Sequence, residues 1–171
     1  MENITLINGD CIDELSNLPS NSVDLIITDP PYTTPTVTAF GRETVKNFAD
    51  FSIQSHYVRS LKAEFERVLK PDGRLFIFCD DKYYPVIYPV FYNWQSSQLI
   101  VWDKGRIGMG SPFRKQHELL FYACRQSYEH NKTGSITHFP TIMKCAPESD
   151  KLHGAQKPLE LIQKLIMAII Y

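Results

Sequence analysis

The stretch that decides the fold is SVDLIITDPPY, residues 22–32. Its first part is a continuous apolar run rich in β-branched residues, which predicts a buried strand over residues 23–28. The run leads directly into the tetrapeptide Asp29, Pro30, Pro31 and Tyr32. A carboxylate and an aromatic ring therefore follow the carboxyl end of a strand, which is where open α/β sheets bind their ligands. We expect the functional site to lie there.

Similar apolar runs along the chain predict the rest of a sheet. They lie at residues 4–7, 75–79, 99–102 and 119–123. Their continuous apolar character is expected where helices cover both faces of a sheet. Apolar residues at helical spacing predict helices over residues 12–18, 58–69, 83–93 and 158–171. This alternation predicts an α/β fold with crossover helices.

Two features interrupt this alternation. Pro71-Asp72-Gly73 predicts a turn that ends the second helix. Residues 33–54 and 126–156 lack a clear period and are expected to form long loops, which in compact domains are usually functional or mobile.

Composition places the chain among globular proteins. Its 171 residues are 43% hydrophobic and 22% charged, which predicts one folded domain rather than a disordered chain. The net charge of −1 excludes a general polycationic attraction to nucleic acid, so any DNA contact requires a local patch. The four cysteines are scattered without a C-x-x-C pair, which argues against a zinc site or a disulfide framework.

Composition also suggests a location. The first residues, MENITLINGD, lack the pattern of a secretion signal, and no stretch approaches the roughly 18 apolar residues that span a bilayer. We expect a soluble cytoplasmic protein with reduced thiols.

The tetrapeptide at residues 29–32 suits an exocyclic amine. The Asp29 carboxylate and the Pro30 carbonyl can both accept N–H bonds, and the prolines hold the loop rigid without donating bonds of their own. Tyr32 can stack on a base, which must first leave the duplex. A turn that only ends the strand is the alternative interpretation of the tetrapeptide.

Four further segments, together with the tetrapeptide and its strand, form a pattern that extends over nearly the whole chain. In order, the chain contains NGDC (8–11), NSVDLIITDPPY (21–32), LKPDGRLFIF (69–78), RKQHELLFYACR (114–125) and HGAQKPLELIQKLI (153–166). Together they resemble the β-type N6-adenine or N4-cytosine DNA methyltransferases. The resemblance implies a Rossmann-like sheet, S-adenosylmethionine as cofactor and DNA as partner. It implies direct methyl transfer to the amine of a flipped base, without a metal or a covalent enzyme intermediate.

The resemblance also assigns the catalytic residues. Catalysis would rest on alignment and on preorganised acceptors in the tetrapeptide Asp29, Pro30, Pro31 and Tyr32. Adenine N6 is favoured over cytosine N4, because the cytosine enzymes of the family more often carry Ser at the position of Asp29. Related enzymes with Asn in this place methylate RNA or glutamine, and Asp favours DNA.

The same resemblance implies cofactor contacts in three parts of the chain. Asp10 and Cys11 match the position near the cofactor's adenine, and Asp29 borders the cofactor. The Asp10 side chain is equally suited to cap a helix, and the two roles are compatible. His153 and Lys157 match the segment that reaches the methionine end, where a cation can pair with the α-carboxylate. A simple polar lead-in to the last helix is the alternative for Lys157.

A basic segment lies between two predicted strands. It contains Lys104, Arg106, Arg114 and Lys115. A contact with the DNA backbone and a solvated surface loop are both compatible with this pattern. His117 and Glu118 end the segment where the family commonly carries a similar pair near the target base. A structural role is the alternative for a histidine beside a strand.

One family segment is absent from this sequence. Members continue past the last helix into a strand and a turn of the form Asp-Pro-Phe-x-Gly-x-Gly, which holds the cofactor. The family's sheet places that strand and its successor between those expected at residues 4–7 and 23–28. We expect a catalytic domain over residues 1–171 that is truncated at the C-terminus, with an incomplete sheet. A complementary C-terminal fragment or subunit would then be a partner; the alternative is an inactive fragment that binds nucleic acid or such a subunit.

Overall fold

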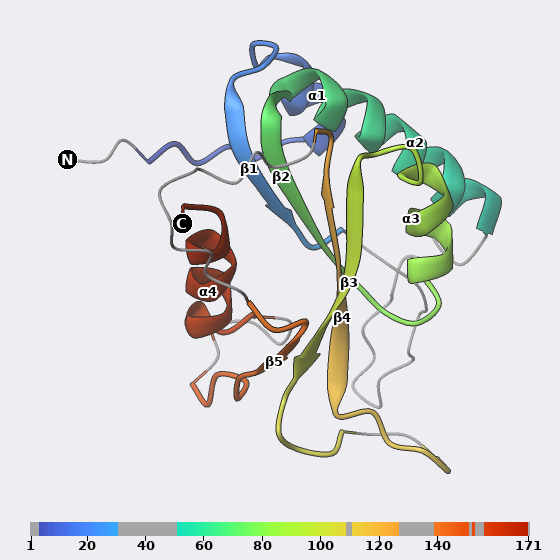
Figure 1. Ribbon diagram of the computed structural model, residues 1–171, viewed down its shortest axis with the longest axis vertical. Coiled ribbons are helices and arrows are strands. Elements are labelled where there is room, and N and C mark those ends of the chain that lie inside the picture. The colour runs from blue at the N-terminus through green and yellow to red at the C-terminus, as the bar shows by residue number, and fades with distance from the viewer. Residues whose placement is uncertain are drawn as a thin grey trace.

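The computed structural model describes residues 4–30, 51–108, 111–126, 139–150, 152 and 156–170. These ranges form an α/β fold whose helices lie on both faces of one sheet (Figure 1). The elements are α1 (Cys11–Ser16), β1 (Val23–Thr28), α2 (Phe51–Val68), β2 (Leu69–Cys79), α3 (Tyr84–Val90), β3 (Ser96–Asp103), β4 (His117–Cys124), β5 (Ile142–Lys144) and α4 (Leu159–Ile170). The predicted fold class is confirmed.

The sheet is mixed, with the strand order β1-β2-β4-β3-β5. β1 and β2 are parallel, as are β3 and β5, whereas β4 runs antiparallel to both β2 and β3. The carboxyl ends of β1, β2 and β3 therefore meet the amino end of β4 at one end of the sheet. Side chains from four strands can converge there.

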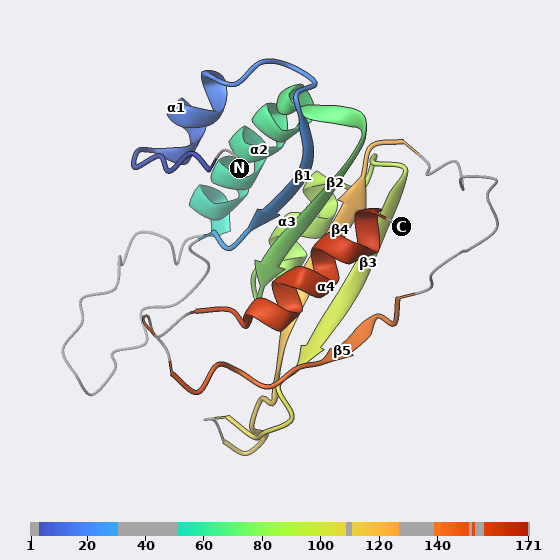
Figure 2. The ribbon, with the colours of Figure 1, turned by 90° about the vertical axis from the view of Figure 1, so that its left-hand side faces the viewer.

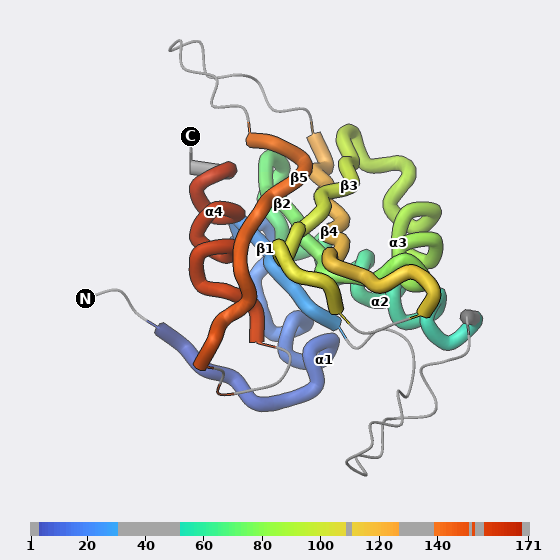
Figure 3. The backbone as a smooth tube through the Cα atoms, turned by 90° about the horizontal axis from the view of Figure 1, so that it is seen from below, coloured from blue at the N-terminus to red at the C-terminus, as the bar shows by residue number. Residues whose placement is uncertain are grey.

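Two hydrophobic clusters hold the layers together. On one face, α2 and α3 pack against β2 and β4 through residues such as Phe65, Ile87 and Phe121. On the other face, α4 packs through Leu161 and Leu165 against the opposite side of the same strands. Figures 2 and 3 show α4 alone on this second face. Burial on both faces explains why the strands read as continuous apolar runs.

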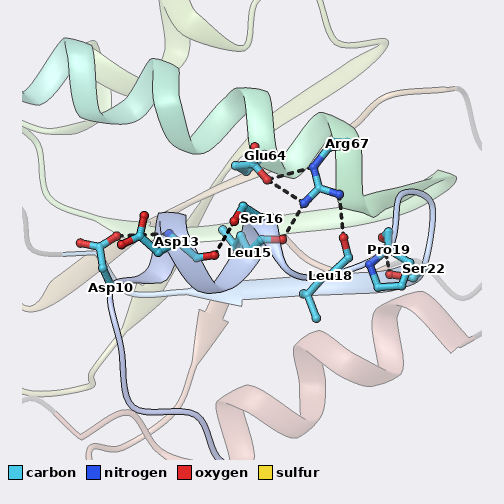
Figure 4. A network of polar contacts seen from close by, with 9 residues as sticks. All are labelled: Asp10, Asp13, Leu15, Ser16, Leu18, Pro19, Ser22, Glu64 and Arg67. Carbon is cyan, nitrogen blue, oxygen red and sulfur yellow. Dashed lines mark hydrogen bonds and ion pairs between the residues drawn. The ribbon is translucent and has the colours of Figure 1, made fainter.

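The short helix α1 is attached to α2 by one arginine. Arg67 donates from Nη1 to the carbonyl of Leu18 at 2.6 Å and from Nη2 to that of Leu15 at 2.5 Å, and it pairs with Glu64 at 2.7 Å (Figure 4). At its other end, Asp10 caps the helix by accepting from the backbone N–H of Ile12 at 2.9 Å. A helix of six residues is not stable alone, so these contacts and α2 hold it in place. The capping role expected of Asp10 is confirmed.

Replacing Arg67 with Ala is expected to lower the free energy of unfolding by about 1–3 kcal/mol, because two carbonyls at the end of α1 lose a charged donor. Urea denaturation measures this change. Arg59→Ala is the matched control, since Arg59 lies exposed on the same helix and should change stability by less than about 0.5 kcal/mol. Equal effects of the two substitutions would contradict the role assigned to Arg67.

The prediction of a strand at residues 4–7 is wrong. These residues form no strand, and Ile4, Leu6 and Ile7 are exposed. A strand requires a hydrogen-bonded neighbour, and among the described residues β1 pairs with β2 alone. The apolar pattern is therefore present without the pairing that would turn it into a strand.

Other boundaries differ because of contacts distant in sequence. The turn expected at residues 71–73 lies inside β2, where the register between β1 and β2 shifts and residues 70–73 bulge out. Gly73 fits this bulge, since a Cβ there would lie 3.0 Å from the carbonyl oxygen of Lys70. Residues 51–54, expected in a loop, begin α2, and β5 lies inside the second expected loop. Residues 31–50 and 127–138 lie outside the described ranges.

The buried Cys79 thiol and the partly buried Tyr122 hydroxyl make the fold sensitive to alkaline pH. Burial raises the pKa of the Cys79 thiol to about 12 and that of the Tyr122 hydroxyl to about 12. The unfolded chain releases these protons at lower pH than the folded chain does. The contribution of these two groups to stability should therefore be constant below about pH 9 and fall as the pH rises towards 12.

The Tyr122 contribution can be separated by substitution. Urea midpoints measured between about pH 7 and alkaline pH should fall less steeply for Tyr122→Phe than for the unaltered chain. Tyr92→Phe removes an exposed hydroxyl and should leave the slope unchanged. An unchanged slope in Tyr122→Phe would show that this hydroxyl does not contribute.

Within the described ranges, no helix combines the length and apolar character needed to cross a membrane. All four cysteines are free thiols, of which Cys11 is exposed and the others are buried.

Candidate active site

Asp29 and Lys157 meet at the carboxyl end of β1. Asp29 follows the last residue of that strand, and Lys157 comes from the chain just before α4. Lys157 Nζ lies 2.7 Å from Asp29 Oδ2, across 128 positions of sequence. The lysine side chain is only 13% exposed, whereas the aspartate is 34% exposed. The contact joins the two segments on which the resemblance depends most.

Lys157 has two further partners on the same face of the sheet. Its Nζ lies 3.4 Å from Glu118 Oε2 and 4.9 Å from the centre of the Phe78 ring. Lys104 approaches the other oxygen of Glu118 at 2.5 Å. Four groups thus form a row of alternating charge: Asp29, Lys157, Glu118 and Lys104. We call these four residues the charged row.

The charged row follows from strand geometry. Side chains alternate between the two faces of a sheet, and Trp102 of β3 lies directly opposite Glu118 of β4. Trp102 and Phe78 both belong to the cluster beneath α4, so Glu118 projects from the α4 face as well. The chain before α4 crosses this end of the sheet and delivers Lys157 to the same face. Lys104 also lies 5.1 Å from the centre of the Trp102 ring.

The charged row has acceptor capacity that the described residues do not use. Glu118 Oε2 is buried and accepts no hydrogen bond from the described residues, although Lys157 lies near it. The partly exposed Asp29 retains lone pairs that one contact with Lys157 does not use. A ligand that carries a carboxylate beside an ammonium group suits such a site, because the cation can bind the ligand's carboxylate and the two carboxylates can bind its ammonium group. Among the described residues, no cluster of His, Cys, Asp or Glu is arranged to hold a metal ion.

A pocket of about 260 Å³ adjoins the charged row. Its lining includes Asp80, Asp81, Lys104, Lys115, His117 and Glu118. Lys115 forms a hydrogen bond with Asp81, which lowers the pKa of that carboxyl. The pocket therefore has walls of both charges and shares two residues with the charged row.

The residues expected at the cofactor's adenine lie on α1. Asp10 caps that helix, and Cys11 Sγ lies 3.3 Å from the Tyr57 hydroxyl oxygen. Among the described residues, no hydrogen bond or ion pair joins them to the charged row. Asp29 lies near the end of β2, since the preceding Thr28 pairs with Ile77 of that strand.

The other expected site residues have varied surroundings. Pro30 is buried, whereas Pro31, Tyr32 and His153 lie outside the described residues. Two of the four cations expected at DNA are engaged in ion pairs, Lys104 with Glu118 and Lys115 with Asp81. The exposed Arg114 donates to the carbonyl of Gly108 at 2.7 Å, and Arg106 is exposed. Their contacts with DNA stay predictions.

Glu118 was expected near the target base, together with His117, on the resemblance alone; its contact with Lys157 was not expected. The structure places the adjacent His117 exposed at the pocket wall. The alternation of side chains along β4 indicates the face that Glu118 takes, because it shares the face towards α4 with Leu120 and Tyr122. Its partner Lys157 is distant in sequence, so the pairing itself had no local signal.

Comparisons with known proteins show the family to which the chain is similar. The DNA methylase family of the N6 and N4 types matches residues 23–170. The type II methyltransferase M.HpaI of Haemophilus parainfluenzae is 38% identical over 196 residues, which cover 95% of this chain and 59% of that protein. M.HhaII of Haemophilus parahaemolyticus is 34% identical over 110 residues, covering 61% of this chain and 47% of that protein. The chain thus spans about half the length of these relatives.

Solved structures share the fold at low sequence identity. The cytosine-N4-specific PvuII DNA methyltransferase has a TM-score of 0.66 at 15% identity, over 92% of this chain and 67% of that one. A putative DNA modification methylase of Thermus thermophilus, complexed with S-adenosyl-L-methionine, has a TM-score of 0.64 at 20% identity, over 94% and 72% of the two chains. The expected methyltransferase sheet is confirmed. On the family match and the identity to M.HpaI, the chain belongs to the DNA methylase family of N6- and N4-type methyltransferases.

Proposed function

We propose that this chain forms the amine-binding part of a DNA methyltransferase that uses S-adenosylmethionine. It acts on the exocyclic amine of a flipped base, and on adenine N6 in preference to cytosine N4. The observation that carries the proposal is the ion pair between Asp29 and Lys157, which unites the two segments most specific to the family. A solved relative in fold is complexed with this cofactor, which supports the same cofactor here.

The residues of the charged row fit the cofactor chemically. S-adenosylmethionine, when bound, supplies a methyl group attached to a positively charged sulfur. Its amino acid end carries a carboxylate and an ammonium group, and the charged row places the Lys157 cation between the carboxylates of Asp29 and Glu118. Asp10, Cys11 and His153 are proposed as additional contacts.

Asp29 and Pro30 would act on the target amine. The carboxylate and the carbonyl each accept one N–H, which holds the nitrogen in one orientation for attack on the methyl carbon. The nitrogen would gain positive charge as it takes the methyl group from sulfur, and the Asp29 carboxylate would stabilise that charge until one N–H proton is released to solvent. The buried position of Pro30 keeps this part of the loop against the sheet. Pro31 would hold the loop rigid, and Tyr32 would stack on the flipped base.

Product analysis tests this proposal directly. The chain is incubated with S-adenosylmethionine and duplex DNA, alone and with a C-terminal segment of M.HpaI, and the digested DNA is examined by mass spectrometry. N6-methyladenine is the expected product. N4-methylcytosine without N6-methyladenine would overturn the assigned base. No methylated base in either mixture would overturn the activity.

A second candidate function is that of an inactive fragment that binds nucleic acid or a complementary subunit. It is favoured by the outer edge of β1, which no other described strand covers and which could accept a strand from a partner. Calorimetry distinguishes the two candidates. Heat on addition of S-adenosylmethionine supports the first, whereas no heat together with salt-sensitive DNA binding favours the second.

A further inference from the structure

The segment between β3 and β4 contains side chains that the active site does not use. It projects beyond the end of the sheet that carries the charged row (Figure 2). Residues 104–117 include four Lys or Arg and no acidic residue. Two of these cations are paired with Glu118 and Asp81. Among the described residues, Arg106 and Arg114 form no ion pair, so their charges are available to an external anion.

Each of these arginines adjoins an exposed apolar side chain. Ile107 follows Arg106 and is 59% exposed, and Phe113 precedes Arg114 and is 92% exposed. Hydrogen bonds bring the two pairs together: the Gly108 N–H donates to the carbonyl of Lys115 at 2.7 Å, and Arg114 Nε donates to the carbonyl of Gly108 at 2.7 Å. The segment thus presents two apolar side chains beside two guanidinium groups that have no carboxylate partner in the described part of the chain. We call Arg106, Ile107, Phe113 and Arg114 the loop wedge.

The chemistry of the loop wedge matches duplex DNA. Guanidinium groups bind backbone phosphates, and an aromatic ring stacks on bases of any sequence. Apolar side chains that enter a base step unstack it, which is how several proteins deform DNA. An apolar protein partner would bury the two arginines without carboxylates to pair them, at an energetic cost. DNA satisfies both kinds of side chain at once.

The position of the loop wedge fits the same partner. Gly108 and Lys115, which connect its two halves, also line the pocket beside Glu118. Glu118 in turn contacts Lys157, which holds Asp29. A base flipped into the pocket would therefore leave an empty place in the base stack of the duplex, and that place would lie close to the loop wedge.

We propose that Phe113 enters the base stack at the gap left by the flipped base, while Arg106 and Arg114 bind the flanking phosphates and Ile107 widens the apolar contact. This inference rests on the proposed function, because only a flipped base leaves such a gap. Stacking of Phe113 offsets the loss of stacking by the extruded base. The wedge therefore favours the extruded state and not DNA binding in general.

Fluorescence of 2-aminopurine tests the wedge. The probe is a duplex with 2-aminopurine beside an adenine, compared with the same duplex in which that adenine faces an abasic site. Phe113→Ala should weaken binding of the paired duplex about tenfold and abolish the fluorescence increase. Binding of the abasic duplex should change less, because its adenine already unstacks easily. Tyr92→Ala is the control, since Tyr92 is also an exposed aromatic, 75% exposed, and precedes β3 at its other end.

Salt dependence separates the stacking of Phe113 from the phosphate contacts of the arginines. Arg114→Ala should reduce the slope of log affinity against log salt concentration by about one, and Phe113→Ala should leave it unchanged. Unaltered affinity and fluorescence in Phe113→Ala, or an equal loss in Tyr92→Ala, would overturn the inference, as would absence of DNA binding by the unaltered chain. Failure of the proposed function is distinguishable from failure of this inference. If only the proposed function fails, no methylated product forms, but Phe113→Ala still weakens binding of the paired duplex.

Discussion

Replacing Asp29 with Ala is expected to reduce methyl transfer at least about 100-fold in a complemented system, because the amine loses its charged acceptor and the developing positive charge loses its stabilising partner. The substitution also leaves Lys157 with Glu118 as its remaining carboxylate. Single-turnover transfer to DNA, followed with labelled cofactor, measures the loss. Because Asp29 is partly exposed, the fold should tolerate the change.

The matched control for this experiment is Asp24→Ala. Asp24 lies on the same strand and also pairs with a lysine, Lys70, at 2.6 Å, but it is well exposed and lies at the other end of β1. Its removal should leave transfer within about twofold, since exposed ion pairs contribute little. Full activity in Asp29→Ala would remove Asp29 from the reaction. Equal losses in both variants would indicate damage to β1 rather than a chemical role.

Replacing Lys157 with Met is expected to weaken S-adenosylmethionine binding by about 10- to 100-fold, as expected for one charge-assisted hydrogen bond. The carboxylates of Asp29 and Glu118 would lose the cation that lies between them. Methionine keeps an apolar stem beside the Phe78 ring, so packing there is largely preserved. Calorimetry with the cofactor measures the affinity without requiring turnover.

Two comparisons make the Lys157 result specific. Lys157→Arg keeps the charge and should recover part of the affinity. Lys164→Met removes a partly exposed lysine of α4 that pairs with Glu160 at 2.6 Å, and it should not change cofactor binding. Unchanged affinity in Lys157→Met would limit this lysine to orienting Asp29. That outcome would appear as a lower kcat with an unchanged KM.

Most elements of the fold could be predicted because their signals are local. The apolar run before Asp29 and the periodic face of α2 depend on neighbouring residues, and the structure confirms both elements. The errors concern pairing. Residues 4–7 have the composition of a strand without a neighbour, and β5 is three residues long and exists through its register with β3. Composition alone does not reveal whether a strand has a partner.

In the candidate site too, local patterns could be predicted and contacts between distant residues could not. The tetrapeptide that begins at Asp29 is a local pattern, so its place at the end of a strand could be inferred directly. Lys157 was expected at the cofactor on resemblance alone, and its contact with Asp29 had no sequence signal because 128 positions separate the two residues. Glu118 gained its role from strand pairing, which sets it opposite Trp102 and towards α4.

The sequence by itself determined the α/β class, the strand that ends at Asp29 and the cap at Asp10, because hydrophobic period, proline and capping chemistry act over a few residues. Only the tertiary structure decided that Asp29, Lys157, Glu118 and Lys104 form one row of alternating charge. Strand order and the path of the chain before α4 bring these residues together. The strand order and the path of this chain segment depend on the simultaneous burial of both faces of the sheet. No single segment of sequence contains that information.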